Sequence, residues 1–472
     1  MLSDLYRASL SLLTDFYQLT MAYSYWKQGM QDHEAIFHLF FRKNPENNGF
    51  CIAAGLETAL DYLEQFQFTQ DDVEYLATLK GHDNQPLFET AFLAYLKTVR
   101  FTGNIDAIPE GTLVFPHEPL LRVQGSLLQC QLVESALLNI INFQTLIATK
   151  ANRICRAAMG DQVLEFGLRR AQGIDGGLSA SRAAYLGGCS ATSNVLAGKL
   201  YDIPVKGTHA HSWVMSFDSE ISALRAYSES MPNNCVFLVD TYDTYQGVAN
   251  AIKIGLELKQ QGRQLLGIRL DSGDLTVLSQ YARNELNQAG LSQVKIIASN
   301  DLDEYEIAQL KQKRAAIDIW GVGTRLITSY DQPALGGVYK LAALRAPGQT
   351  WQYKLKRSEQ AIKTSIPGIL QVARYLDHHD FFAMDLIYEA GQENKLSLNS
   401  HLSLHSLLIP VMQAGEYCAE YPSLLQIQQR VSDQLAHLPE SIRALSTPDI
   451  YRVQLDNELS LRQQQLMAQY NC

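Results

Sequence analysis

The chain has 472 residues, of which 46% are hydrophobic and 19% are charged. This length predicts about two or three domains, and the composition is that of a compact globular protein and not of a disordered one. The formal net charge of −10, from 39 Lys and Arg against 49 Asp and Glu, repels polyanions, so we expect neither nucleic acid nor a membrane as a partner. Residues 150–210 differ, with eight basic residues and four acids, which indicates either a local anion site or solvated surface charge.

Cysteine usage and the apolar segments indicate the compartment. The seven cysteines are scattered and never spaced as CxxC, which argues against a disulfide framework or a zinc site. The N-terminus has no basic segment followed by an apolar core, so we expect no signal peptide. The most apolar long segment, 127–149, contains Glu134 and several amides and predicts a buried helix, not a membrane span. These features favour a cytoplasmic protein.

The first quarter of the chain predicts an N-terminal α/β open-faced sheet domain over 1–125. Residues 11–28 have helical spacing of apolar side chains behind a possible cap at Thr14. Segments 35–42 and 99–125 predict strands of an antiparallel sheet, and prolines interrupt the second segment.

A different pattern begins at 126–159, which predicts a long helix that is apolar on nearly all sides. From 163 to 323, short apolar runs alternate with helical stretches, as in a parallel sheet covered on both faces. Such repeated units predict an α/β barrel or a large doubly wound sheet. We assign 126–345 to the barrel, and 346–472 to a C-terminal segment, irregular and then helical, that packs back on both domains. The apolar runs are 163–167, 203–207, 236–240, 265–270, 294–298 and 317–322.

Polar and reactive residues follow nearly every predicted strand. Because barrel active sites are built from the loops at the carboxyl ends of the strands, we expect these residues on one rim. Any one of them could simply cap a helix. Arg169 and Arg269 should point near the centre of the rim, where a guanidinium group can bind a phosphate or a carboxylate, although either could instead pair with a nearby aspartate.

Two pairs of residues on this rim allow more than one interpretation. Asp271 and Asp274 could hold Mg²⁺ or sugar hydroxyls, or cap the following helix. His209 and His211 could bind a metal only with a third ligand nearby, so a single imidazole acting as a nucleophile or acid/base is favoured.

Two glycine-rich segments could bind anions. Gly321, Gly323 and Thr324 follow a late strand, and 187–194 is the segment GGCSATSN; each can present backbone N–H groups to a phosphate at a helix N-terminus. Together with the arginines, they predict one phosphate-handling rim around His211.

Six motifs, in this order and spacing, resemble those of the nicotinate phosphoribosyltransferase family. The resemblance covers residues 11 to about 345 and is most specific in EFGLRRAQG, GTHAHSWV and RLDSGDL. It implies the type II phosphoribosyltransferase fold. It also implies a reaction of nicotinate with 5-phosphoribosyl 1-pyrophosphate that gives nicotinate mononucleotide and pyrophosphate, coupled to ATP hydrolysis, in NAD salvage. The six motifs are TDFYQLTMAYSYWKQG, EFGLRRAQGIDGGLSAS, YLGGCSATSNVLAG, PVKGTHAHSWVMSF, GIRLDSGDL and GVGTRLITSYDQPALGGVYKL.

The resemblance also implies roles for individual residues. His211 would be the histidine that ATP phosphorylates, in keeping with an imidazole as a covalent nucleophile. Phe166 and Tyr17 would flank the pyridine ring, with Tyr17 contributed by the partner subunit of a homodimer. For Tyr17 the alternative is a helix face packed into the core.

The same resemblance assigns the polar contacts. Arg269 and Thr208 would contact nicotinate. Arg169, Asp271 and Thr324 would surround the phosphoribosyl group and its Mg²⁺, with Asp271 as the expected Mg²⁺ ligand. In catalysis, Arg169 and Asp271 would act together with the histidine.

The choice of nicotinate over nicotinamide depends on one position. Ser193 stands near the place where nicotinamide-using relatives have an aspartate, and the loss of that charge suits a carboxylate substrate. Two alternatives remain: a nicotinamide phosphoribosyltransferase, and a non-catalytic barrel that binds nucleotides. The presence of Arg169, His211, Arg269 and Asp271 counts against the non-catalytic barrel, because a binding module needs no nucleophile.

Overall fold

The computed structural model describes residues 10–358, 360, 364–396, 403–418 and 420–469. By their contacts the residues group into two compact units, one formed by Met1–Leu146 with Ala334–Cys472 and the other by Ile147–Pro333. The second unit lies inside the range 126–345 that the sequence predicts for the barrel. The expectation about a signal peptide concerns a segment that includes residues 1–9, which lie outside the described residues.

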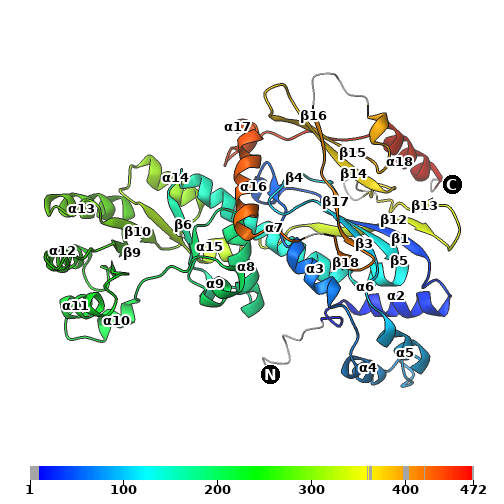
Figure 1. Cartoon of the computed structure of the whole chain (residues 1–472), viewed down its shortest axis with the longest axis horizontal. Coiled ribbons are helices and arrows are strands. Elements are labelled where there is room, and N and C mark those ends of the chain that lie inside the picture. The colour runs from blue at the N-terminus through cyan, green and yellow to red at the C-terminus, as the bar shows by residue number, and fades with distance from the viewer. Residues whose placement is uncertain (1–9, 359, 361–363, 397–402, 419, 470–472) are drawn as a thin grey trace. The chain divides into compact units, whose positions relative to one another are not determined.

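The first unit is built around a seven-stranded antiparallel sheet whose strands come from both ends of the chain (Figure 1). Within it, strand β1 (Glu34–Phe41) pairs with β12 (Gly337–Arg345) on one side and β5 (Leu121–Ser126) on the other. Because β1 is buried along nearly its whole length, its apolar residues form a continuous run, and 35–42 predicts it closely. The other strands of this sheet are β13 (Gln352–Tyr353), β3 (Asn104–Ala107), β17 (Ile409–Gln413) and β18 (Glu416–Tyr417).

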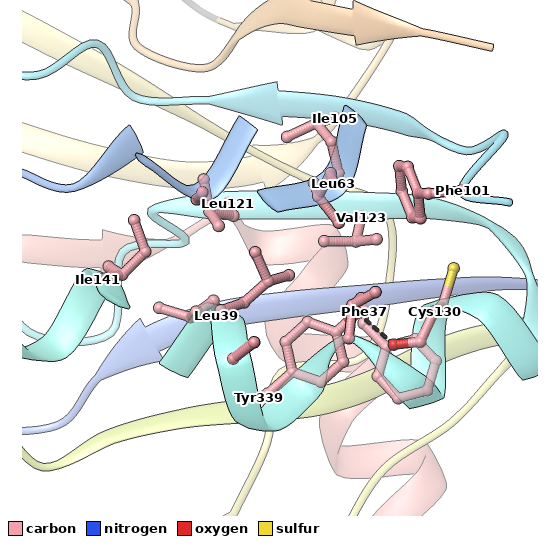
Figure 2. Packing of buried hydrophobic residues seen from close by; sticks show 14 of the residues in the cluster. Phe37, Leu39, Leu63, Phe101, Ile105, Leu121, Val123, Cys130, Ile141 and Tyr339 are labelled. Carbon is pink, nitrogen blue, oxygen red and sulfur yellow. Dashed lines mark hydrogen bonds between the residues drawn. The ribbon is translucent and has the colours of Figure 1, made fainter. Parts of the chain in front are cut away.

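A large hydrophobic core packs against this sheet (Figure 2). Phe37 of β1 stacks on Tyr339 of β12 with ring centroids 4.7 Å apart. The Tyr339 hydroxyl donates a hydrogen bond of 2.8 Å to the backbone oxygen of Cys130, shown as the dashed line in Figure 2. A buried tyrosine needs such a partner, so this contact lets an aromatic ring fill the core without leaving a polar group unpaired.

The helices of the first unit differ from prediction in two details. Helix α2 (Phe16–Lys27) has Asp15 at its N-cap position. The predicted cap at Thr14 is therefore wrong, because the Thr14 hydroxyl donates to a backbone oxygen of α6 (Leu127–Leu132) at 3.3 Å. The single helix predicted over 126–159 is two helices, α6 and α7 (Glu134–Ala157). In the described ranges no helix is long and apolar enough to cross a membrane.

The chain after 346 is not irregular, contrary to the prediction. Strands β14 (Leu370–Leu376) and β15 (Phe382–Glu389) pair at the centre of a second, four-stranded sheet. Arg374 is buried in β14 and pairs with Asp385 of β15, with 2.6 Å between Nη2 and Oδ2. This buried charge pair interrupts the apolar period of both strands and hides them in the sequence. The remaining elements are β16 (Ser403–Ser406), β19 (Val453–Leu455), α16 (Leu424–His437), α17 (Glu440–Arg443) and α18 (Asn457–Gln469).

The second unit contains a six-stranded parallel sheet in the order β7-β6-β11-β10-β9-β8. Figure 1 shows α12 (Thr244–Gln260) and α13 (Leu275–Gln288) along the outer side of β9, which both helices contact. Five of the predicted apolar runs form strands, and one strand was not predicted. The strand that was not predicted is β7 (Ala191–Thr192). The five predicted strands are β6 (Gln162–Glu165), β8 (Val236–Leu238), β9 (Gly267–Leu270), β10 (Lys295–Ser299) and β11 (Ile319–Val322).

The sixth run, 203–207, forms only an isolated parallel bridge to β7. Thr192 donates to the backbone oxygen of Pro204 and accepts from the N–H of Lys206, each at 3.0 Å. Pro204 has no N–H to give, which limits the pairing. Two residues beyond the run, His209 contacts β8 at the opposite edge of the sheet. The segment thus lies between the two edge strands, and the sheet closes into the irregular α/β barrel that the sequence predicts.

Candidate active site

Three of the predicted site residues, Arg269, Asp271 and Thr208, share one hydrogen-bonded network with Ser299 at the carboxyl end of β10. Nε of Arg269 donates to Oγ of Ser299 at 2.8 Å, its Nη2 lies 2.7 Å from Oδ1 of Asp271, and its Nη1 donates to Oγ1 of Thr208 at 3.3 Å. Ser299 in turn donates to Asp271. The guanidinium is therefore held on three sides, and its plane is fixed before any ligand arrives.

An aromatic ring completes this arrangement. The guanidinium carbon of Arg269 lies 5.6 Å from the ring centroid of Phe166, which follows β6. Gly321 leaves room for that ring, because a Cβ atom there would lie 2.8 Å from a Phe166 ring carbon. Gly321 lies within β11, so it supports the ring and does not belong to a helix N-terminus as the sequence interpretation suggested. A flat ring beside a guanidinium group is suited to an aromatic ligand with a negative charge.

His211 stands at the start of helix α10 (His211–Met215) and faces the same network. Its Nε2 lies 3.7 Å from Oδ2 of Asp271, and its Nδ1 lies 3.2 Å from Oγ1 of Thr241. The side chain is 42% exposed. The imidazole is thus oriented by two partners and still accessible to a substrate, as a nucleophile requires.

His209 is oriented differently, and its position separates the roles of the two histidines. The ring is buried against Tyr227, with centroids 4.8 Å apart, and its Nε2 accepts a hydrogen bond of 3.2 Å from the backbone N–H of Leu238. Burial lowers the pKa of His209, which favours the neutral ring. Both ring nitrogens of His209 have partners, since Nδ1 lies 3.4 Å from the carbonyl oxygen of Ala210, and His211 is therefore the more accessible imidazole on the rim.

Asp271 combines burial with strong hydrogen bonding. Burial by itself would raise its pKa, but the hydrogen bond from Ser299 and the charge of Arg269 outweigh that effect and lower the pKa below the usual value. Asp271 therefore remains a carboxylate. Asp274 instead caps α13, accepting from the N–H groups of Thr276 at 2.9 Å and Val277 at 3.1 Å, so the cap interpretation of this residue is confirmed.

Asp240 is a site residue that the sequence reasoning missed. It follows β8, and its Oδ2 accepts from the N–H of Asp271 at 2.8 Å and from the hydroxyl of Ser272 at 2.6 Å. Its Oδ1 is buried and accepts no hydrogen bond from the described residues. The only signal in the sequence is an aspartate at the carboxyl end of the apolar run 236–240, a signal that a helix cap also gives.

Arg169 and Thr324 lie outside this hydrogen-bonded network. Arg169 is exposed in the turn η2 (Leu168–Arg170) after β6 and forms no ion pair with the described residues. Thr324 is the first residue of α15 (Thr324–Ile327). Tyr17 belongs to the first unit, on α2, with 49% of its surface exposed. Its alternative interpretation as a core residue is therefore wrong.

The interior of the barrel contains a cavity of about 390 Å³. Phe166 and Thr208 line it, as do apolar strand residues such as Leu164 and Ile297. Two residues of the expected base site thus lie on the cavity wall. In the described ranges, no group of three or more His, Cys, Asp or Glu side chains is placed to hold a metal ion.

Comparison with known families covers most of the chain. Residues 12–142 match the nicotinate phosphoribosyltransferase (NAPRTase) N-terminal domain, and 162–367 match the nicotinate phosphoribosyltransferase (NAPRTase) family. Residues 383–462 match the nicotinate phosphoribosyltransferase C-terminal domain. The three matches follow one another in the order of the chain.

Individual relatives agree with these matches. The nicotinate phosphoribosyltransferase of Bacillus subtilis (strain 168) is 44% identical over 468 residues, which cover 95% of this chain and 94% of the relative. The crystal structure of human nicotinic acid phosphoribosyltransferase aligns with a TM-score of 0.81 and 31% identity, over 96% of this chain and 100% of that one. The nicotinate-nucleotide pyrophosphorylase of Pyrococcus furiosus, with a TM-score of 0.69 and 22% identity over 90% of this chain and 95% of that one, supports the fold alone. The predicted type II phosphoribosyltransferase fold is confirmed, and the chain belongs to the nicotinate phosphoribosyltransferase family.

Proposed function

We propose that the chain is a nicotinate phosphoribosyltransferase, which joins nicotinate to 5-phosphoribosyl 1-pyrophosphate to give nicotinate mononucleotide and pyrophosphate in NAD salvage. The observation that carries the proposal is the guanidinium of Arg269, held by Ser299 and Asp271 and lying 5.6 Å from the ring centroid of Phe166. A fixed cation beside an aromatic face matches a pyridine ring that carries a carboxylate.

The chemistry of the reaction suits this kind of site. The ring nitrogen of nicotinate already has a lone pair, which forms the bond to C1 of the ribose as the bond from C1 to the pyrophosphate oxygen breaks. No strong base is needed at the nucleophile. The site has to align the two reactants and stabilise the positive charge on the ribose and the negative charge on the departing pyrophosphate. The exposed cation of Arg169 is our candidate for a contact to the phosphates.

Magnesium is the expected metal of the reaction, and the acids on the rim suit it. Asp271 is a carboxylate with Oδ2 facing the rim, and Asp240 beside it has a buried oxygen that accepts no hydrogen bond from the described residues. Mg²⁺ prefers one or two carboxylates together with substrate phosphate oxygens. When bound, it would neutralise the charge of the leaving pyrophosphate.

We also propose that ATP hydrolysis is coupled through a phosphohistidine at His211. Nε2 would attack the γ-phosphorus with its lone pair, the bond from that phosphorus to the bridging oxygen would break, and ADP would leave. Water later releases inorganic phosphate from the ring nitrogen. The accessibility of His211 and its contacts to Asp271 and Thr241 support this assignment.

The remaining expectations concern assembly and location. We propose a homodimer in which Tyr17 of one subunit completes the base site of the other, because this tyrosine is exposed on α2 where a core residue would be buried. We further propose that the enzyme works in the cytoplasm on small-molecule substrates.

One assay tests the proposed activity. The protein is incubated with 5-phosphoribosyl 1-pyrophosphate, Mg²⁺ and either nicotinate or nicotinamide, with and without ATP, and the mononucleotides are quantified by liquid chromatography. We expect nicotinate mononucleotide, in larger yield with ATP. Product from nicotinamide alone would overturn the choice of substrate, and the absence of any mononucleotide would favour a non-catalytic barrel.

A further inference from the structure

Glu165 is the last residue of β6 and is completely buried. Its neighbours along the chain, Leu164 and Phe166, both line the barrel cavity. Because successive side chains of a strand point to opposite faces, Glu165 points away from the cavity and toward the covering helix α8 (Ile174–Leu186). It is therefore a buried acid beside the base site that does not face the base.

Three donors converge on the carboxyl group of Glu165. One oxygen accepts from the backbone N–H of Gly167. The other accepts from the hydroxyl of Ser181 on α8 at 2.9 Å and from the hydroxyl of Thr192 on β7 at 2.6 Å. The Ser181 hydroxyl also lies 2.9 Å from the carbonyl oxygen of Gly177, one turn back on α8, so its single proton is shared between two acceptors. The carboxyl group of Glu165 thus joins the turn after β6, helix α8 and strand β7.

These bonds reach two walls of the expected base site. On one side, the bond to Gly167 fixes the turn that directly follows Phe166. On the other side, Thr192 exchanges backbone hydrogen bonds with Pro204 and Lys206, which lead into Thr208. The backbone carbonyl of Glu165 also accepts a 2.9 Å hydrogen bond from the N–H of Ser193, the residue that follows β7.

We propose that Glu165 is a positioning residue that sets the distance between Phe166 and Thr208 and thereby the affinity for the pyridine base. The inference rests on the proposed function, since it concerns the base site of that reaction. The proposal predicts that the loss of one of these hydrogen bonds raises the KM for nicotinate, because Phe166 or Thr208 is then misplaced. A misplacement of a binding group by about an ångström can reduce the rate a hundredfold. A purely structural role would lower the melting temperature and the fraction of active protein and leave the KM unchanged.

The test uses variants that each change one partner in the hydrogen bonds of Glu165. Glu165→Gln keeps the shape and one acceptor oxygen, and we expect a rise in the KM for nicotinate on the order of tenfold. Ser181→Ala and Thr192→Val each remove one donor and should give smaller rises. Glu165→Met keeps the length of the side chain and has no acceptor oxygen, so in that background Ser181→Ala should add little further effect on the KM, because the contact to Ser181 is already lost.

Ser279→Ala is the matched control. Ser279 is also a completely buried serine on a covering helix, α13, and it likewise bonds a carbonyl one turn back, that of Thr276. Its second partner is the N–H of Ala316, which precedes β11 at the opposite end of the barrel. We expect a loss of thermal stability similar to that of Ser181→Ala, with an unchanged KM.

The outcomes separate the two proposals. Formation of nicotinate mononucleotide by the unaltered enzyme tests the proposed function on its own. The positioning role is then judged on an enzyme known to be active. Glu165 has no such role if the three variants, Glu165→Gln, Ser181→Ala and Thr192→Val, lower the melting temperature and leave the KM for nicotinate unchanged. An additive effect of Ser181→Ala and Glu165→Met on the KM would also overturn the inference. Calorimetric titration with nicotinate gives the affinity of any variant that is too slow to assay.

Discussion

Nε2 of His211 lies 3.7 Å from Oδ2 of Asp271, while Nδ1 of the same ring lies 3.2 Å from the hydroxyl oxygen of Thr241. If Nδ1 carries the proton and donates it to Thr241, Nε2 is left with its lone pair free. The carboxylate beside Nε2 can then stabilise the positive charge that the ring acquires when this nitrogen forms a new bond. The geometry therefore favours Nε2 as the atom that would carry a phosphoryl group.

The first prediction concerns this histidine. His211→Ala should abolish the incorporation of acid-labile phosphate from γ-labelled ATP, and should abolish the stimulation of mononucleotide synthesis by ATP. His209→Gln is the control: its side-chain oxygen can still accept from the N–H of Leu238, so labelling should persist. Labelling that survives in His211→Ala would move the role to another residue, and its loss in His209→Gln would point to His209.

The second prediction concerns recognition of the carboxylate. Arg269→Lys keeps the charge but cannot reach Ser299, Asp271 and Thr208 together, so the ammonium group is less well placed. A hydrogen bond to a charged group contributes roughly 1.5–3 kcal/mol, so we expect the KM for nicotinate to rise about tenfold to a hundredfold. Steady-state kinetics at saturating phosphoribosyl pyrophosphate measure the change.

The matched control for this arginine is Arg283→Lys. Arg283 lies on α13 in the same unit and pairs with Asp318 at 2.8 Å, next to the start of β11 and away from the rim. Its replacement should alter the KM for nicotinate by less than about twofold, because its hydrogen-bond partners, Ser292, Val294 and Asp318, precede β10 and β11 at the end of the barrel opposite the rim. Equal changes in the two variants would mean that Arg269 acts through the stability of the barrel and not through contact with the base.

The rim could be predicted from sequence for a simple physical reason. Parallel strands end at one edge of a sheet, so residues that follow successive apolar runs, such as Thr208, Arg269 and Asp271, must come together. Their partners could not be identified in the same way. Ser299 and Asp240 each stand at a strand end, where a serine or aspartate also serves as a helix cap, and only the fold shows that both bond to the network.

The parts of the fold that the sequence hid depend on non-local pairing. Arg374 and Asp385, eleven positions apart in sequence, neutralise each other across two paired strands, so a charged residue occupies a buried position in each strand. Periodicity reports only which residues are apolar and cannot reveal a buried ion pair. For 203–207 the apolar run was present, but Pro204 lacks the N–H that a ladder strand needs.

The third prediction concerns Tyr17 and the dimer. If Tyr17 acts across the interface, Tyr17→Ala and His211→Ala dimers should each lose the ATP-stimulated synthesis of the mononucleotide, and mixing them after mild dissociation should restore it. After simple exchange of subunits, about half of the dimers contain one chain of each variant. In each of these mixed dimers, one of the two sites has both Tyr17 and His211 intact, so about a quarter of full activity is expected. No recovery on mixing would place Tyr17 in the site of its own chain or outside the site. Tyr75→Ala, an equally exposed tyrosine of α4 (Gln70–Ala77) with 57% of its surface accessible, should stay active without mixing.

The fourth prediction concerns stability in acid and involves His38 on β1. The ring is buried, and its Nε2 accepts a hydrogen bond of 3.2 Å from the N–H of Leu370. Burial, with a smaller effect of the charge on Arg122, lowers the pKa of His38 to about 3. In the unfolded chain a histidine titrates near its ordinary value, which is about 6.5.

The sign of the effect follows from the two protonation states. Between about pH 6.5 and pH 3 the unfolded chain binds a proton at His38 that the native state does not, so the free energy of unfolding falls as the pH falls. For this residue the loss between pH 6.5 and pH 5 is about 1.5 kcal/mol. His38→Gln keeps an acceptor for Leu370 and removes the titration, so its urea unfolding free energy should fall by about 1.5 kcal/mol less over that interval. His405→Gln, at an exposed histidine of β16, should behave like the unaltered protein, and an identical pH dependence in all three would show that His38 is not buried as a neutral ring.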